Sequence, residues 1–341
     1  MASEAPPFWW SRPDWRAWSL WPFAKLYGFV AGQRMLRAPR EKIDVPVLCI
    51  GNFTVGGSGK TPVAIAFARQ ARRMKLKPGI LSRGYGGSAG HARLVDPAHD
   101  LAKHVGDEPL LLAEHALVAV CADRAAGARL LLGQGCDFLI MDDGFQSAKI
   151  HIDYALIVVD GRYGLGNGHV IPAGPLRAPL VHQMRFATAL LRLGKGSDGD
   201  TAVRRASRAG RPVFLASIRT RAAERFAGRR FLAFAGIGHP EKFFATIEAA
   251  GGTVAARRPF ADHHFFAPDE LADLSSAAER DGLELITTAK DAARLRHGAA
   301  SPEFLARLNV LDIEAVFDDA SAPSRIIEET RASWKRRRLE S

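Results

Sequence analysis

The chain has 341 residues, of which 47% are hydrophobic and 24% are charged. This composition is that of an ordinary globular protein and argues against intrinsic disorder, while the length suggests two compact units or one large α/β unit. The excess of Lys and Arg gives a formal net charge of +11, which favours anionic partners without choosing among nucleotides, nucleic acid and anionic lipid. The three cysteines, Cys49, Cys121 and Cys136, form no CxxC pair, so neither a disulfide framework nor a zinc site is predicted.

Residues 1–40 are rich in aromatic and basic side chains. They contain five of the six tryptophans, namely Trp9, Trp10, Trp15, Trp18 and Trp21. Indole rings and long cationic side chains favour a membrane interface. Lys25 and Pro22 interrupt the apolar stretch, and Pro22 is expected to kink or end a helix, so no confident transmembrane span is predicted. We interpret residues 8–38 as an in-plane or partly inserted membrane anchor; the alternative is a helix packed on the protein's own core.

In residues 41–182, predicted strands alternate with predicted helices. Strand patterns occur at 45–52, 79–82, 117–121, 137–142 and 154–159, and helical patterns at 60–74, 107–116 and 124–133. This alternation indicates a doubly wound, mostly parallel α/β sheet. The Gly- and Pro-rich segment 161–182 is predicted to be a long functional loop.

Residues 183–330 predict a second, smaller αβ lobe. Its expected elements are strands at 187–192, 212–216, 231–236, 283–288 and 309–313 and a helix at 240–250. The polar segment 195–210 is interpreted as a linker or a solvated helix. Residues 331–341 are expected to be a basic tail that contacts solvent or lipid, since no nucleic-acid-binding signature accompanies them.

A glycine-rich turn follows the first predicted strand and precedes a predicted helix. It consists of Thr54, Val55, Gly56, Gly57, Ser58, Gly59, Lys60 and Thr61. Apart from Thr54 in place of the first glycine, it matches the phosphate-binding P-loop pattern G-x-x-x-x-G-K-[ST]. Backbone N–H groups of such a turn and the N-terminus of the following helix favour phosphate. Lys60 is expected to reach the β- and γ-phosphates of a nucleotide, and the Thr61 hydroxyl to bind Mg²⁺.

Two adjacent aspartates, Asp142 and Asp143, end the strand pattern at 137–142. In P-loop NTPases, an aspartate at a strand end beside the P-loop holds Mg²⁺ directly or through water. Neighbouring side chains of a strand point to opposite faces, so only one of the two is expected to meet the metal first. An acidic turn is the alternative.

Three other charged clusters have two interpretations each. Asp107 and Glu108 open a predicted helix, where acidic residues also serve as caps that complement the helix dipole. The loop segment 262–264 places an aspartate beside two histidines, which suits a proton acceptor, although loop histidines are commonly just solvated. Lys290 and Asp291 follow a strand, but no Asn precedes them, which argues against a guanine-reading motif and hence against a GTPase.

Eight collinear stretches make the sequence similar to the tetraacyldisaccharide 4'-kinases, the lipid A kinases of Gram-negative bacteria. They are GNFTVGGSGKTP (51–62), LSRGYGG (81–87), VGDEPLLLA (105–113), DDGFQ (142–146), DGRYGLGNGHVIPAGPLR (160–177), FAGIGHPEKFF (234–244), FADHH (260–264) and TTAKDAARL (287–295). The family tolerates Thr at the first position of its P-loop. The resemblance implies a P-loop NTPase-like fold with two αβ lobes joined by a hinge and an N-terminal membrane-associated helix.

The resemblance also implies an activity. The family uses ATP and Mg²⁺ to phosphorylate the 4'-hydroxyl of a tetraacyldisaccharide 1-phosphate, a lipid A precursor, at the cytoplasmic face of the bacterial inner membrane. By resemblance, Asp107 is the catalytic carboxylate and His263 assists it. The remaining candidates are Glu108, Asp142 and Asp143 in the metal-facing part of the site, and Arg124, Asn167 and Arg177 as phosphate or substrate contacts.

The sequence departs from the family pattern at two positions. Ser147 stands where members often have His, and Ala178 where they often have Glu, so no role is carried over to these side chains. Two rival functions stay open on the P-loop alone: a soluble enzyme that phosphorylates a small metabolite, and a P-loop ATPase or GTPase that acts as a switch. Nucleic acid is not an expected partner, because no motif supports it.

Overall fold

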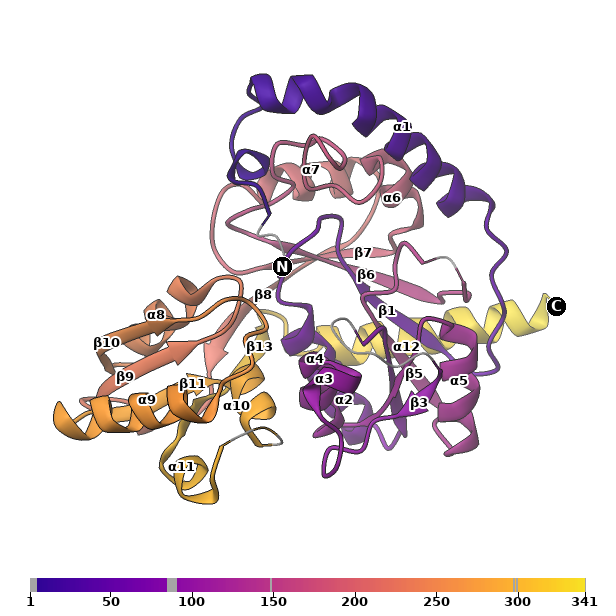
Figure 1. The fold of residues 1–341 in the computed structure, drawn as a ribbon. Coiled ribbons are helices and arrows are strands. Elements are labelled where there is room, and N and C mark those ends of the chain that lie inside the picture. The colour runs from indigo at the N-terminus through magenta and orange to yellow at the C-terminus, as the bar shows by residue number, and fades with distance from the viewer. Residues whose placement is uncertain (1–4, 85–90, 148, 297, 299, 341) are drawn as a thin grey trace.

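The computed structural model describes residues 5–84, 91–147, 149–296, 298 and 300–340 (Figure 1). Residues 85–87 of the motif LSRGYGG (81–87) therefore lie outside the described residues. The described chain forms two αβ lobes of different size, and the long N-terminal helix α1 (Trp15–Arg37) lies across the larger one.

The larger lobe is built on a nine-stranded sheet with the order β13-β8-β7-β6-β1-β5-β2-β4-β3. Its strands are β1 (Val47–Gly51), β2 (Pro78–Ser82), β3 (Arg93–Leu94), β4 (Leu117–Val120), β5 (Phe138–Asp142), β6 (Tyr154–Asp160), β7 (Ala189–Leu193), β8 (Val213–Thr220) and β13 (Ile313–Phe317). All pairings are parallel except those of β3 with β4 and of β13 with β8. The central strands are buried on both faces, as a sheet covered by helices on both sides requires.

Alternate side chains of the central strands enter two separate cores. Leu48 and Ile50 of β1 pack with α2 (Lys60–Arg73), α4 (Asp107–Ala113) and α12 (Ala322–Leu339). Val47 and Cys49 point to the other face, which is covered by α1 (Trp15–Arg37), α5 (Arg124–Gly133), α6 (Leu180–Phe186) and α7 (Asp200–Arg208). This two-sided covering confirms the predicted doubly wound sheet. The short helix α3 (Ala102–Val105) adds to the first core.

The smaller lobe has a parallel four-stranded sheet with the order β10-β9-β11-β12. Its strands are β9 (Arg230–Ala235), β10 (Thr253–Pro259), β11 (Glu284–Thr288) and β12 (Asn309–Leu311), and its helices are α8 (Pro240–Ala249), α9 (Pro268–Arg280), α10 (Ala289–Arg296) and α11 (Pro302–Arg307). Two cores of its own lie on the two faces of this sheet. Figure 1 shows the lobe in orange beside the large sheet.

The strand pairings place the boundary between the two lobes at a different position from the expected one. The expected second lobe, 183–330, contains β7, β8 and β13, but these strands extend the large sheet because each pairs with a strand of that sheet. The strand expected at 309–313 is two strands, β12 and β13, which belong to different sheets. We therefore propose that the smaller lobe comprises about residues 222–311, inserted between β8 and β13.

The C-terminal segment is helical. The basic tail expected at 331–341 is, through Leu339, the end of helix α12. Arg337 donates hydrogen bonds to the buried carboxylate of Asp153 and to the carbonyl oxygen of Ile43. Helix α12 lies along the sheet, and the guanidinium group of Arg337 compensates the buried charge of Asp153. The segment is therefore the last part of a packed helix rather than a separate tail.

Helix α1 has one small-residue face and one aromatic face. It continues through Pro22, so the helix does not end there; a proline removes one helical hydrogen bond. Its buried residues are Ala17, Ala24, Gly28, Gly32 and Met35. Its exposed residues include Trp15, Trp18, Phe23, Leu26, Phe29 and Val30. Among the described residues, no helix combines the length and the hydropathy needed to cross a bilayer.

Candidate active site

The glycine-rich turn connects β1 to α2 at the carboxyl edge of the large sheet. Gly59 caps α2 in the left-handed conformation, with φ of 78°, and Lys60 is the first helical residue. A Cβ atom on Gly59 would lie 2.4 Å from Cδ2 of Leu193, so both its backbone angle and its surroundings require glycine. The side chains of Ser58 and Thr61 are buried against the turn. This is the strand–turn–helix arrangement that the P-loop pattern requires.

The aspartate pair lies next to this turn because β1 and β5 are neighbours. Ile50 of β1 pairs with Asp142 of β5, so both strands end at the same edge. The Lys60 Nζ atom lies 3.6 Å from Oδ1 of Asp143. The expected meeting of the two motifs is therefore present, with Asp143 itself in the left-handed region at φ of 50°.

Arg177 holds Asp143 and the turn together. Its two terminal nitrogens donate to the two carboxylate oxygens of Asp143 at 2.8 and 3.1 Å, and its Nε donates to the carbonyl of Thr54 at 3.0 Å. Burial opposes ionisation of Asp143, but the charges of Lys60 and Arg177 outweigh it and lower the pKa. Two cations therefore already satisfy Asp143.

Asp142, unlike Asp143, is not held by an ion pair with a cation at hydrogen-bond distance in the described residues. It is 2% exposed, and its Oδ1 atom has no hydrogen-bond partner among the described residues. Burial, followed by repulsion from Glu108, raises the pKa of this carboxyl above its usual value. A buried, unsatisfied carboxylate oxygen beside a P-loop fits a bound cation. No group of three or more carboxylate, His or Cys side chains in the described parts of the chain has metal-binding geometry. Mg²⁺ in nucleotide sites commonly uses only one or two carboxylates together with phosphates and water.

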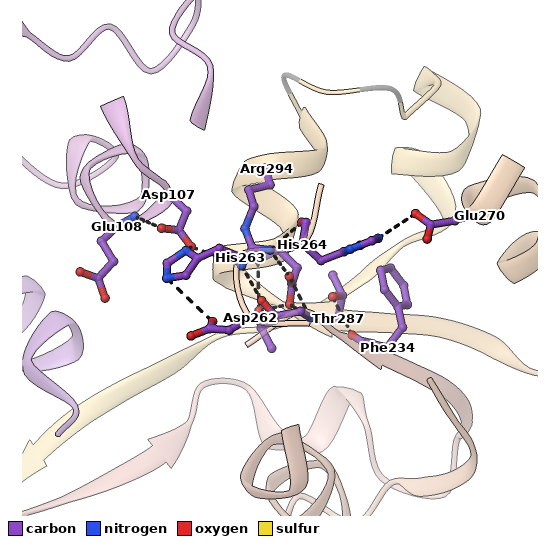
Figure 2. Close-up of polar contacts among 12 residues, drawn as sticks. Asp107, Glu108, Phe234, Asp262, His263, His264, Glu270, Thr287 and Arg294 are labelled. Carbon is purple, nitrogen blue, oxygen red and sulfur yellow. Dashed lines mark hydrogen bonds and ion pairs between the residues drawn. The ribbon is translucent and has the colours of Figure 1, made fainter. Parts of the chain in front are cut away.

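Asp107 is held by residues of both lobes. It begins α4 in the larger lobe and is 3% exposed. Its Oδ2 atom lies 3.3 Å from Nδ1 of His263 and 3.2 Å from Nη2 of Arg294, both from the smaller lobe. Figure 2 shows the Asp107 carboxylate reaching toward these two side chains, while Glu108 points away from them. The side chain is thus a functional carboxylate candidate rather than a solvated helix cap.

The contacts of Asp107 keep it ionised. Burial disfavours its charge, but the hydrogen bond from His263 and the charges of Lys290 and Arg294 bring its pKa below the ordinary value. The same hydrogen bond raises the pKa of His263. An ionised carboxylate in contact with an imidazole can accept a proton and pass it on.

Arg294 fixes the small-lobe side of this cluster. It is buried, and it donates to the carbonyl oxygens of Gly236 and His264, each at 2.9 Å. Its Nη1 atom lies 3.1 Å from Oδ1 of Asp291, and Oδ2 of the same carboxylate accepts from the Thr288 hydroxyl at 2.6 Å. The sequence arguments did not select Arg294, although it lies in the stretch 287–295 that carries the family resemblance.

Lys290 is the second residue that sequence arguments did not place in the site. Its ammonium group pairs with the Glu108 carboxylate across the two lobes. Burial works against its charge, but Glu108 and Asp107 raise the pKa of Lys290, so it stays protonated. The sequence analysis considered Lys290 and Asp291 only as a possible guanine-reading motif. The contact of Lys290 with Glu108 could not be predicted, because only the folded chain shows that α10 faces α4.

The remaining candidates have mainly structural contacts. Arg124 is buried at the start of α5 and donates to the carbonyl oxygen of Cys121 at 2.7 Å; its charge acts on Asp142 and Asp143. The Asn167 amide donates to the carbonyl oxygens of Ala173 at 2.8 Å and of Phe8 at 3.4 Å. The structure therefore brings Arg124 and Arg177 to the aspartate pair, whereas Asn167 binds its own loop and the N-terminal segment.

The two departures from the family pattern lie near this site. The Ser147 hydroxyl donates to the carbonyl oxygen of Gly144 at 2.7 Å, just after the aspartate pair. Ala178 is fully buried beside Arg177. The Ser147 hydroxyl is thus bonded to the main chain, and the Ala178 side chain has no polar atom.

Comparison with known proteins agrees with this geometry. A family model described as Tetraacyldisaccharide-1-P 4'-kinase matches residues 16–331. The chain belongs to this family. A curated "Tetraacyldisaccharide 4'-kinase" of Mesorhizobium japonicum is 65% identical over the full length of both chains, and one of Brucella suis is 56% identical over 99% of each. The sequence resemblance is thereby confirmed.

A solved structure supports the same conclusion for the fold. The chain resembles LpxK from Aquifex aeolicus, crystallised in complex with ATP, with a TM-score of 0.73 and 25% sequence identity. The match covers 92% of this chain and 99% of that one. The large, mostly parallel sheet and the N-terminal helix of this kinase family are therefore present here.

Proposed function

We propose that this chain transfers the γ-phosphate of ATP to the 4'-hydroxyl of a tetraacyldisaccharide 1-phosphate, a lipid A precursor. The observation that carries the proposal is the convergence of the P-loop, the unsatisfied Asp142 carboxylate and the Asp107–His263 pair in a chain of the 4'-kinase family. The P-loop and Lys60 suit a nucleotide triphosphate, and Asp107 suits a proton acceptor for a hydroxyl group.

Each residue has a distinct role in the proposed reaction. Lys60 would hold the β- and γ-phosphates, while Asp142 and the Thr61 hydroxyl would hold Mg²⁺. Bound Mg²⁺ supplies neutralisation of phosphate charge. Asp107 accepts the proton of the sugar hydroxyl as its oxygen attacks the γ-phosphorus, and His263 orients the carboxylate and relays the proton. Arg177 keeps Asp143 paired, so that Asp142 is the carboxylate left for the metal.

Removal of the proton acceptor tests these roles. Asp107→Asn and His263→Ala are each expected to lower kcat by a factor of about 10²–10⁴, the usual contribution of general acid–base catalysis. The affinity for ATP should stay close to that of the unaltered protein, because neither side chain belongs to the P-loop. Equilibrium binding of ATP, measured beside steady-state kinetics, checks both statements. Full kcat in both variants would remove the pair from the mechanism.

We propose further that the protein acts at a membrane surface, at the cytoplasmic face of the inner membrane. The substrate is amphiphilic, and the exposed aromatic face of α1 is suited to the interface between headgroups and acyl chains. The opposite, small-residue face of α1 packs on the larger lobe, which would hold the active site near headgroup depth.

The decisive experiment is a transfer assay. The full chain is incubated with γ-³²P-labelled ATP and a tetraacyldisaccharide 1-phosphate in mixed micelles, and Lys60→Ala serves as the inactive control. Label in the lipid, dependent on Lys60, supports the proposal. Release of inorganic phosphate without an acceptor, or transfer only to a water-soluble acceptor, contradicts it.

A further inference from the structure

Lys290 lies where the two lobes meet in the active site. It is in the first turn of α10, directly after β11 of the smaller lobe. Its ammonium group pairs with Glu108 of α4, the residue next to the proposed proton acceptor Asp107. About a third of the Lys290 side chain is exposed, so the ion pair is partly accessible to solvent.

The charge of Lys290 acts on three carboxylates of the site. Besides Glu108, it interacts electrostatically with Asp107 and with Asp142. Asp142 also interacts with the ammonium group of Lys60. The buried carboxylate beside the P-loop therefore has two lysines near it, one from each lobe.

Stability of the lobe contact does not account for this lysine. A cation in the first turn of a helix opposes the helix dipole, so Lys290 is unfavourable for α10 itself. The Lys290–Glu108 pair is only partly buried, so solvent screens it, and such a pair contributes about 1 kcal/mol. Arg294 already joins α10 to Asp107 through buried contacts, and Lys242 pairs with Asp160 at 2.9 Å in a second bridge between the lobes.

We propose that Lys290 is a catalytic residue whose ammonium group contacts the γ-phosphoryl group during transfer. This inference rests on the proposed function. Lys60 then holds the γ-phosphoryl group from the larger lobe and Lys290 from the smaller one, so that charge neutralisation is complete only when both lobes enclose the nucleotide. The Glu108 carboxylate holds the Lys290 side chain in position until the phosphate arrives.

The proposed step is balanced without a covalent role for Lys290. A bond forms between the sugar 4'-oxygen and the γ-phosphorus, and the bond from the γ-phosphorus to the bridging oxygen breaks. The electron pair of that bond leaves with ADP, and the hydroxyl proton goes to Asp107. Lys290 stays protonated and stabilises negative charge on the transferred group.

Two lysine variants separate catalysis from lobe bridging. Lys290→Met is expected to lower kcat by at least about 10²-fold, the usual cost of losing a transition-state donor, with ATP affinity changed little. Lys242→Met removes a comparable bridge between the lobes, from Lys242 to Asp160, and its kcat should stay within about threefold, as the small energy of a partly exposed ion pair predicts. Equal losses in the two variants would show that Lys290 only joins the lobes.

Affinity for a transition-state analogue would not change if Lys290 had only a structural role. Affinity for ADP with aluminium fluoride should fall by about 10²-fold in Lys290→Met, whereas affinity for ADP alone should not change. Equal changes in both affinities, or no change in either, would overturn the proposal. This binding measurement needs no lipid, so failure of the unaltered chain to phosphorylate the lipid would refute the proposed function without deciding the role of Lys290.

Chemical rescue covers the case in which Lys290→Met folds poorly. Lys290→Cys can be converted with 2-bromoethylamine to a lysine analogue, and the three native cysteines are free but buried. Alkylation should restore most of the lost kcat, while the same treatment of the unaltered chain should change little. Alkylated Lys290→Cys that remains as slow as the unmodified variant would count against a catalytic ammonium group.

Discussion

At the scale of single residues, Gly59 shows how the P-loop depends on backbone geometry. Its φ of 78° disfavours any side chain, and a Cβ atom at this position would meet Cδ2 of Leu193 at 2.4 Å. Gly57, two residues earlier, has open space around the place of a Cβ atom. The two glycines of one turn therefore differ in what they tolerate.

The pair of alanine variants tests this difference. Gly59→Ala should lower the free energy of unfolding by about 1–3 kcal/mol, from left-handed backbone strain and overpacking. Gly57→Ala is the matched control and should stay within about 0.5 kcal/mol, as expected for open positions. Chemical denaturation of both variants measures the difference. Equal stability of the two variants would contradict the geometry of the turn.

Asp142 makes stability depend on pH in the absence of metal. Its pKa is raised in the folded chain, so the folded state holds this proton more firmly than the unfolded state. Stability contributed by the protonated form is therefore complete below the unfolded pKa of about 4 and is lost as pH rises through the folded value. Asp142→Asn, which cannot ionise, avoids this loss.

Without Mg²⁺ and nucleotide, Asp142→Asn should accordingly be more stable than the unaltered chain at about pH 8, and the advantage should shrink toward about pH 4. Thermal unfolding across this pH range in EDTA is the measurement. The same variant should lose Mg²⁺-dependent turnover, because the carboxylate proposed for the metal is gone. A stability difference that does not vary with pH would show that Asp142 is not the group held protonated.

At the scale of secondary structure elements, α1 separates two functions between its faces. Gly32 lets the helix approach α6 closely, because a Cβ atom at this position would lie 2.3 Å from Nδ1 of His182. The large apolar side chains point elsewhere, with Trp15, Phe23 and Leu26 exposed by 76%, 65% and 67%. Packing on the protein and contact with lipid therefore use different residues.

Variants of the two faces should differ accordingly. Replacing Trp15, Phe23 and Leu26 together by Ser should weaken sedimentation with lipid vesicles at least about tenfold, with the melting temperature unchanged, because these side chains bury little surface on the protein. Gly32→Leu should do the reverse, lowering stability by about 1–3 kcal/mol through overpacking. Undiminished sedimentation of the serine variant, or of a chain lacking residues 1–38, would contradict a membrane role for α1.

At the scale of the whole molecule, the smaller lobe is an insertion in a β-hairpin of the larger one. Thr220 of β8 pairs with Ile313 of β13, and Arg221 N–H donates to the carbonyl oxygen of Asp312 at 2.9 Å. The chain thus leaves and re-enters the large sheet at one point. Residues 222–311 have their own sheet and cores, and in the described residues they dock on the larger lobe through helix α10, which packs on α4.

Excision of the smaller lobe tests this organisation. Residues 222–311 are replaced by Asn-Gly, a two-residue loop that favours a tight hairpin between the antiparallel strands. The shortened chain should unfold cooperatively and retain ATP binding through the P-loop, but transfer no phosphate, because His263, Lys290 and Arg294 are absent. Failure to fold would show that the large sheet needs the second lobe for stability.

Much of the molecule could be predicted from local patterns in the sequence. Runs of apolar residues predicted the strands around β1 and β5, because strands buried on both faces contain little else. The P-loop and the aspartate pair were recognisable because their chemistry depends on residues close together in the chain. The aromatic N-terminus predicted a membrane-associated helix; a helix is present there as α1, and its contact with a membrane stays a prediction.

The tertiary structure decided what depends on residues far apart in the chain. Lys290 and Arg294 are more than 180 residues from Glu108 and Asp107, and only the docking of α10 on α4 brings them together. The division of β12 from β13 depends on strand pairing, since consecutive strands can join different sheets. The sequence by itself therefore determined the nucleotide-binding half of this protein, while the half of the site that encloses Asp107 was decided by the packing of two lobes, because no local pattern encodes which surfaces will meet.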